Sequence, residues 1–269
     1  MVNSAYIRKR KAKRIVALVT TICGVLALII GAIALLGQRA APLTITLTQS
    51  GAVLDLTQHS DDNAGKTFLV ADDVPDYTPF SNEQFSYYEA TYGNLDNENT
   101  YSQFVVSDNK QTSTKFFKYT FYVTNRGNKT AEYDIRLNIS NPTKDASNRY
   151  EIDSILRVRF YENRNLDEHN YITYAKKSAT PHIDEEGNTS YKELISIDGS
   201  GYAEPFFSNN VVLSKKVTNL LPSESIRYTF VFWLEGEDPE CQDEPPVDSS
   251  LILGVEIGAH EASTNPSSE

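Results

Sequence analysis

The sequence has few of the residues on which cross-linked or metal-dependent proteins rely. Its 269 residues include two cysteines and four histidines. Two cysteines cannot form a disulfide framework, and Cys23 and Cys241 cannot meet in one molecule because Cys23 lies in a long apolar run. The histidines show no HExxH or HxH spacing, so a zinc protease site has no support. These histidines are His59, His169, His182 and His260.

Positive charge is also scarce beyond the first residues. Six of the 25 Lys and Arg residues fall within residues 1–14, a segment without an acid, whereas the chain holds 36 Asp and Glu residues. Residues 15–269 therefore carry 19 cations and a net charge of −17. Such a body repels the phosphates of nucleic acid, which excludes a nucleic-acid binder.

No nucleotide-binding or hydrolase motif is found in the chain. It contains neither a G-x-S-x-G elbow nor a GxxxxGK[ST] phosphate loop. We therefore expect a protein that is not an enzyme, with a membrane-anchored hydrolase as the weakest hypothesis. Cys241 has two interpretations, a single thiol without a special role or a covalent link between two exported chains.

Residues 15–37 form an uncharged, mostly apolar run that follows the cationic segment 1–14. As a helix this run is about 34 Å long, slightly more than a hydrocarbon core of about 30 Å. Cationic segments stay in the cytoplasm, so the pattern predicts a single-pass signal-anchor with the acidic body outside the cell. A cleaved signal peptide is the alternative, and the protein is then secreted.

From residue 115 onward the apolar residues alternate with a period of two, as in β-strands. The run 131–140 points Tyr133, Ile135 and Leu137 inward and the intervening polar residues outward, and with 117–124 it is expected to form an antiparallel hairpin. In residues 155–161, Leu156, Val158 and Phe160 are expected to be buried and Arg157 and Arg159 exposed.

Further strands are expected at 171–175, 190–197, 211–220, 226–234 and 251–257, and one or two strands at 43–57. Residues 226–234 are apolar on both faces, including Trp233, so this strand is expected to be central and buried. The sequence predicts an all-β fold, an antiparallel, jelly-roll-like two-sheet sandwich preceded by the transmembrane helix. The extracellular domain is expected to span 42–260, with long loops at 58–100 and 162–200 and a flexible tail at 261–269.

The segment Leu220–Ser225 followed by IRYTFVFWLEGEDPEC, and the run KYTFYVTNRGNKTAEYDIRLNIS, resemble exported β-sandwich surface proteins of low-GC Gram-positive bacteria and their relatives. The known branch is the camelysin/TasA group of biofilm-matrix and cell-surface proteins. The resemblance covers residues 42–60 and 115–258. It implies a jelly-roll-like sandwich and a role in the surface or matrix. GQRAAPLTITL replaces the cleavage region typical of that group.

Two further groups of side chains are candidates for binding. The acidic turn after Trp233 is dense enough in carboxylates to hold calcium, although its spacing matches no EF-hand; the alternative is a solvated acidic turn whose carboxylates bind backbone amides. The calcium candidates are Glu235, Glu237, Asp238 and Glu240. Exposed tyrosines can contact sugars or proteins, with simple packing as the alternative. These tyrosines are Tyr77, Tyr87, Tyr88, Tyr92 and Tyr101.

Taken together, the sequence predicts a non-enzymatic, membrane-anchored cell-surface protein with a structural, matrix or adhesive role. Its partners are expected to be the membrane through residues 15–37 and, in addition, other copies or other surface proteins. The alternative is a module that binds a glycan or a protein. No cofactor is expected apart from calcium.

Overall fold

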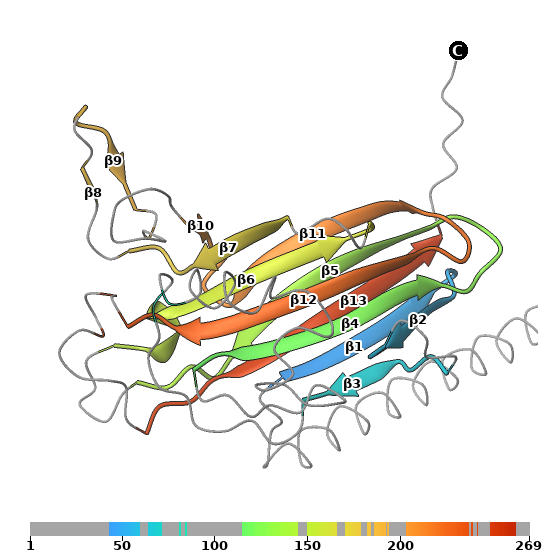
Figure 1. Cartoon of the computed structure of the whole chain (residues 1–269), viewed down its shortest axis with the longest axis horizontal. Helices are drawn as coiled ribbons and strands as arrows, with labels where there is room; N and C mark the ends of the chain where they lie inside the picture. Colours follow the sequence, from blue (N-terminus) through green and yellow to red (C-terminus); the bar gives the residue numbers. More distant parts are fainter. Residues whose placement is uncertain are drawn as a thin grey trace, which may run out of the picture. The chain divides into compact units, whose positions relative to one another are not determined.

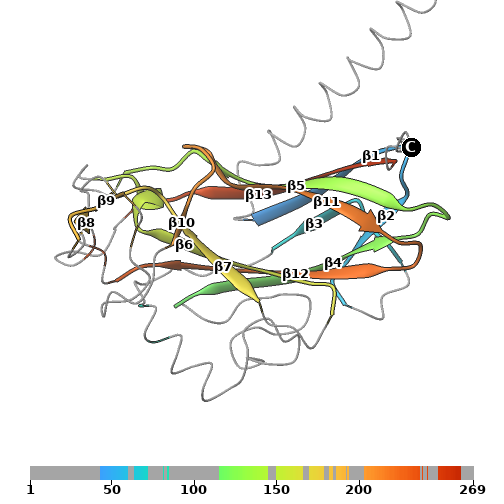
Figure 2. The same ribbon diagram turned by 90° about the horizontal axis from the view of Figure 1, so that it is seen from above.

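Two β-sheets packed face to face form the main body of the structure. The computed structural model describes residues 43–59, 64–71, 81, 84, 115–144, 150–165, 170–178, 182–183, 186–191, 193, 203–236, 238, 241 and 248–261. Figure 2 shows the sheets edge-on as two layers. The predicted all-β, two-sheet fold is confirmed.

The five-stranded sheet has the order β11-β5-β13-β1-β3 and the six-stranded sheet the order β10-β7-β6-β12-β4-β2 (Figure 1). The first sheet contains β11 (Val211–Leu220), β5 (Ala131–Ser140), β13 (Ile252–Glu261), β1 (Leu43–Ser50) and β3 (Phe68–Val70). The second contains β10 (Glu204–Pro205), β7 (Tyr171–Ala175), β6 (Leu156–Asn163), β12 (Ser225–Leu234), β4 (Phe117–Asn125) and β2 (Leu54–Thr57). A separate two-stranded sheet pairs β8 (His182–Ile183) with β9 (Thr189–Ser190), and a 3-10 turn, η3 (Ile152–Ser154), precedes β6.

The prediction of purely antiparallel sheets was wrong, because both large sheets are mixed. Strand β1 runs parallel to β13 along its whole length, from Leu43 opposite Leu253 to Ser50 opposite His260. Strands β10 and β7 are also parallel. Parallel neighbours need a long connection between them. Strands β1 and β13 satisfy this condition because almost the whole domain separates them in sequence.

The predicted hairpin of residues 117–124 with 131–140 was wrong as well. Strand β4 pairs with β12 and β2 in the six-stranded sheet, whereas β5 pairs with β11 and β13 in the five-stranded sheet. The turn between β4 and β5 therefore carries the chain from one sheet to the other. Their burial patterns fit this arrangement, because β4 is buried on both faces and β5 on alternate residues only.

Three such turns lie at the same end of the sandwich and are joined by hydrogen bonds of the buried Asn125 and of the neighbouring Arg126. They connect β1 to β2, β4 to β5 and β11 to β12. The side-chain amide of Asn125 donates to the carbonyls of Lys129 and Leu220 at 2.8 and 2.9 Å, and its oxygen accepts from the Gly127 amide at 2.9 Å. The neighbouring Arg126 amide donates to the Val53 carbonyl at 2.9 Å. We name this group of turns (residues 51–53, 126–130 and 221–224) the corner end.

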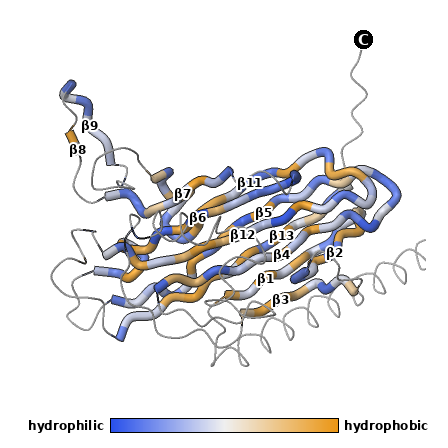
Figure 3. The backbone as a smooth tube through the Cα atoms, viewed as in Figure 1, coloured by the Kyte–Doolittle hydropathy of each residue, from blue (hydrophilic) through white to orange (hydrophobic). Residues whose placement is uncertain are grey.

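The space between the sheets is filled by aliphatic and aromatic side chains. Strand β12 points Tyr228, Phe230 and Phe232 inward, and Phe230 lies 4.9 Å from Phe160 of β6 between ring centres. Strand β12 is central and is buried on both faces, as predicted. Hydrophobic residues follow the strands, and the turns of the corner end are largely hydrophilic (Figure 3).

A pair of buried tyrosines joins the two sheets across this interior. The hydroxyl of Tyr133 on β5 lies 2.6 Å from the hydroxyl of Tyr228 on β12, and both side chains are fully buried. Burial raises the pKa of each phenol well above its ordinary value. Each hydroxyl therefore stays protonated in the folded protein, which lets one donate to the other.

The part of the chain that the structure describes contains no helix long and apolar enough to cross a bilayer. The predicted anchor at 15–37 lies outside the described residues, as does most of the predicted tail, since β13 extends to Glu261. Within the region expected to be the loop 58–100, residues Phe68–Val70 form the edge strand β3. Within 162–200 lie β7, β8 and β9.

Replacing Asn125 with alanine should destabilise the protein by about 2–3 kcal/mol, because the three hydrogen bonds of this buried side chain are lost and the Leu220 carbonyl loses a buried donor. Urea unfolding followed by the fluorescence of Trp233, the only tryptophan, measures this change. Asn128→Ala, an exposed position in the same turn, is the matched control and should cost below about 0.5 kcal/mol. Equal unfolding midpoints for both variants would contradict the proposed role of Asn125.

Stability should also fall as the pH rises above about 10, the ordinary pKa of tyrosine. The unfolded chain loses the protons of Tyr133 and Tyr228 there while the folded protein keeps them, so each contributes a loss approaching 1.4 kcal/mol per pH unit. Urea midpoints measured between about pH 8 and pH 11 should decline less steeply when both tyrosines are replaced by phenylalanine. The exposed Tyr191→Phe variant should keep the original slope, and identical slopes in all three proteins would refute the explanation.

Candidate functional site

The outer face of the six-stranded sheet, which faces away from the five-stranded sheet, carries four buried cations. Arg157 and Arg159 of β6 are each 2% exposed, and Lys118 of β4 and Arg227 of β12 are also buried. The prediction that Arg157 and Arg159 are exposed was therefore wrong. Burying a guanidinium is unfavourable unless carboxylates, carbonyls or aromatic rings replace its water shell, and such groups surround both arginines.

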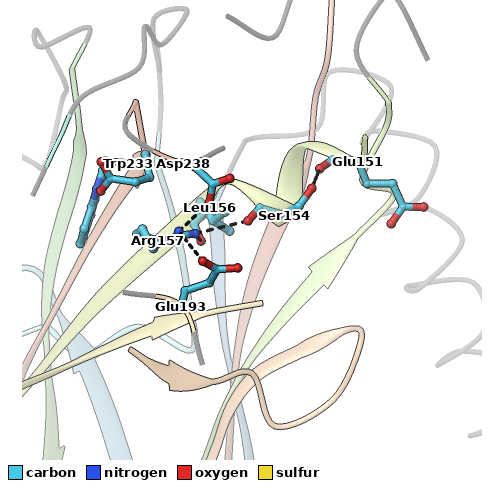
Figure 4. Close-up of polar contacts among 8 residues, drawn as sticks. Glu151, Ser154, Leu156, Arg157, Glu193, Trp233 and Asp238 are labelled. Atoms are coloured by element: carbon cyan, nitrogen blue, oxygen red, sulfur yellow. Dashed lines mark hydrogen bonds and ion pairs between the residues drawn. The ribbon is translucent and has the colours of Figure 1, made fainter. Parts of the chain in front are cut away.

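Arg157 pairs with two carboxylates that lie far from it in sequence (Figure 4). Its Nη2 lies 2.6 Å from Oδ2 of Asp238 and 3.6 Å from Oε2 of Glu193. Its Nη1 donates to the carbonyls of Ser154 and Leu156 at 3.3 and 3.4 Å. The Asp238 side chain is fully buried and that of Glu193 is 8% exposed. This cluster fixes the turn after β12 to the start of β6.

The same turn is held by backbone and indole hydrogen bonds. Nε1 of Trp233 donates to Oε2 of Glu235 at 2.9 Å. The Glu235 amide donates to the carbonyl of Ile155 at 2.8 Å, and the Cys241 amide donates to the carbonyl of Asp238 at 2.8 Å. Glu235 thus supplies an acceptor to the one polar atom of the buried Trp233 side chain.

Arg159 lies between two aromatic rings. Its Cζ is 4.3 Å from the ring centre of Tyr171 on β7 and 5.6 Å from that of Trp233 on β12. Both distances are in the range of favourable cation–π contacts. Trp233 is buried, as the sequence predicted, but on the outer face of the sheet rather than between the sheets.

A second ion cluster lies close to the first along the chain. Nζ of Lys176 is 2.9 Å from Oδ2 of the buried Asp153 and 3.0 Å from Oε2 of Glu151. Partial burial lowers the pKa of Lys176, but the hydrogen bonds to Asp153 and Glu151 outweigh burial and raise it above the ordinary value. Lys176 is therefore a fixed cation and not a nucleophile at neutral pH.

Two of the four predicted calcium ligands can be placed. Glu235 and Asp238 are buried and bind Trp233 and Arg157, whereas Glu237 and Glu240 lie outside the described residues. Among the residues that can be described, none form a cluster of three or more metal-binding side chains. Calcium bound by these four residues stays a prediction.

Other predicted candidates are not brought together by the described structure. The tyrosines Tyr77, Tyr87, Tyr88, Tyr92 and Tyr101 lie outside the described residues, as does His169. Cys241 is 4% exposed and packed into the core. Its burial favours the first of the two interpretations, because the sulfur of another chain cannot reach a buried thiol.

Sequence reasoning missed Arg157 and Glu193 as parts of this site. Two signals were present: two arginines alternate with apolar residues in β6, and the acidic turn follows a strand that is apolar on both faces. An arginine on a strand that neighbours a fully buried strand is itself buried and requires a carboxylate to balance its charge. The turn after β12, which is rich in acidic residues, supplies such a carboxylate. The carboxylates of this cluster balance the charge of Arg157 and hold its side chain in place. Among its described residues, no nucleophile is paired with a base.

Comparisons with known proteins place the chain in no established family. No family model matches it, and no curated protein matches it. One solved structure, described as "AvmM Catalyzes Macrocyclization in Alchivemycin A Biosynthesis", is similar at 14% identity, over 57% of this chain and 83% of that chain, with a TM-score of 0.20. A similarity this weak carries no argument about fold or function.

Replacing Asp238 with asparagine should cost about 3 kcal/mol of stability, because Arg157 then loses its shortest carboxylate contact and the charge of Glu193 lies farther away, at 3.6 Å. Urea unfolding measures the change, and Asp55→Asn is the matched control. Asp55 forms a 3.2 Å pair with Arg126 in which the two side chains are 29% and 42% exposed, so its loss should cost below about 1 kcal/mol. A smaller cost for Asp238→Asn than for Asp55→Asn would show that the buried pair does not hold the turn.

Proposed function

We propose that the protein is a non-enzymatic, single-pass membrane protein that displays its β-sandwich at the cell surface in a structural, matrix or adhesive role. The observation that carries this proposal is the distance in sequence between the apolar run and the sandwich. The run ends at Gly37 and the first strand begins at Leu43. Five intervening residues leave the sandwich no long stalk, so an anchored chain holds it close to the bilayer.

The charge distribution and the resemblance to the camelysin/TasA group support this proposal. Six cations precede the apolar run, and the remainder carries a net charge of −17. Cationic flanks stay in the cytoplasm, which directs the sandwich outward. The resemblance indicates a protein of the cell surface, and the charge distribution indicates a domain outside the membrane. These two arguments are independent and support the same location.

The edges of the sheets decide how such a domain can associate with other copies. Strand β11, with ten residues, forms one edge of the five-stranded sheet, whereas the edge strands β3, β2 and β10 have three, four and two residues. Arg164 donates to the carbonyls of Thr218 and Asn219 at 2.6 and 3.3 Å. Bulges interrupt β11 near both ends. These features limit the addition of a further strand, so contacts through faces and loops are favoured.

A module that binds a glycan or a protein is the second candidate function. The outer face of the five-stranded sheet favours it, because Asp134, Arg136 and Glu256 are exposed there and Gly258 leaves the backbone open. A saturable ligand bound by a chain that does not self-associate would support this candidate. Filaments of the purified protein would support the structural role instead.

The proposed topology predicts a specific result in a protease-protection experiment. In sealed, right-side-out membrane vesicles, added protease should digest the sandwich, while an epitope placed before Arg8 should stay protected until detergent is added. The chain should also remain in the membrane pellet after carbonate extraction, because an apolar helix of this length does not leave a bilayer.

Two results would contradict the proposal. Accessibility of the N-terminal epitope in intact vesicles would reverse the topology. Release of the full-length chain by carbonate would remove the anchor. As a matched control, replacing Val25 and Leu28 with arginine should abolish membrane retention, because central charges oppose insertion.

A further inference from the structure

The start of the first strand defines which end of the sandwich an anchor would hold. Leu43 pairs with Leu253, which pairs with Ile139, and the amide of Ile139 donates to the carbonyl of Asn210 just before β11. The beginnings of β1, β13 and β11 therefore lie at one end, opposite the corner end. We name it the anchor end. Strands of ten residues separate the two ends by about 33 Å.

The three most exposed of the large hydrophobic side chains at this anchor end lie in and next to the β8–β9 pair and before β11. Ile183 is 70% exposed, Phe207 is 68% exposed and Tyr191 is 52% exposed. In the β8–β9 pair Ile183 lies opposite Thr189, and Tyr191 directly follows β9. Figure 1 shows β8 and β9 projecting away from the sandwich, beyond β7 and β10.

Backbone hydrogen bonds connect these residues to the end of β7. The Ser178 amide donates to the carbonyl of Tyr191 at 2.9 Å, and the Phe206 amide donates to the carbonyl of Ala175 at 2.9 Å. The Phe207 amide donates to the carbonyl of Val212 at 3.1 Å, at the start of β11. The hairpin and the segment before β11 are thus parts of the same end as Leu43.

We propose that the anchor end docks on the surface of the lipid bilayer, with Ile183, Tyr191 and Phe207 inserted at the level of the headgroups. This inference rests on the anchor of the proposed function. Six peptide steps join Gly37 to Leu43, so Leu43 lies within about 20 Å of the membrane surface. Aromatic and aliphatic side chains are favourable at that depth.

Because the tether, the short linker between the apolar run and β1, keeps the anchor end near the bilayer, a weak contact with lipid is sufficient for docking. A short linker gives an effective concentration in the millimolar range, so the docked state needs little intrinsic affinity. Exposed hydrophobic residues also occur at the corner end, where Val53 is 51% exposed and Leu221 is 57% exposed. These lie a strand length from the tether, so they serve as the comparison in an experiment.

A lipid-quenching experiment on the full chain tests this docking. The chain, with Cys23→Ser and Cys241→Ala, is reconstituted in vesicles of phosphatidylcholine and phosphatidylglycerol that contain nitroxide-labelled lipid. An environment-sensitive fluorophore is attached at Ile183→Cys, at Phe207→Cys or, at the corner end, at Asn128→Cys. We expect quenching at 183 and 207 at least about three-fold stronger than at 128, because only the anchor end reaches the headgroups.

Two double variants separate insertion from proximity. With the fluorophore at Tyr191→Cys, replacing Ile183 and Phe207 by aspartate should reduce the quenching to the level at 128. The same change at Val53 and Leu221 should leave it unaltered. All four positions are exposed, and Trp233 fluorescence checks that each variant is folded.

The outcomes distinguish this inference from the proposed function. Equal quenching at 183, 207 and 128 in a chain that resists carbonate extraction would overturn the docking and leave the anchor intact. Loss of the chain from the vesicles on carbonate extraction would overturn both. A protein partner at the anchor end would leave the labels unquenched in these protein-free vesicles, which also contradicts docking on lipid.

Discussion

The burial of both faces of the six-stranded sheet is the constraint on which the rest of the structure depends. One face packs against the five-stranded sheet and is aromatic and aliphatic. The other carries arginine and lysine side chains that solvent does not reach. Each buried cation needs a partner, and for Arg157 the partners come from Asp238 and Glu193. Trp233, Glu235 and Asp238 are therefore part of the architecture of this sheet.

The second determinant of the fold is the way in which the chain changes sheets at the corner end. A turn between two adjacent strands commonly makes a hairpin, yet here three turns lead from one sheet to the other. Asn125 connects two of them through its side chain, and Arg126 connects the third through its backbone. Tyr133 and Tyr228 join the two sheets within the core. The corner end is thus tied together, while the anchor end carries the projecting β8–β9 pair.

Local patterns of the sequence predicted much of the fold, and tertiary context decided the remainder. Alternation located β4, β5, β6, β7, β11 and β12 within a few residues, and the doubly apolar β12 was correctly expected to be central. The pairing of the strands was not predictable in the same way. Strands β4 and β5 both alternate and are joined by a short turn, as in a hairpin, but each pairs with strands that are distant in sequence. The exposure of Arg157 was predicted wrongly because alternation shows which residues share a face, not whether solvent reaches it. Of the candidate site, the density of acids singled out Glu235 and Asp238, but as calcium ligands and not as partners of Trp233 and Arg157. Glu193 has no local signal.

The proposed position of the sandwich at the membrane depends on a feature of the sequence and a feature of the structure. An apolar segment of 23 residues predicts an anchor, and such an anchor would hold a sandwich that begins six residues later near the membrane. The most direct test of this central claim is the mass of the mature protein isolated from the cells that produce it, compared between membrane, cell wall and medium. The account predicts an intact chain that includes residues 15–37, recovered in the membrane fraction. A chain that begins near Leu35 or Pro42 and is recovered from the medium or the cell wall would contradict it.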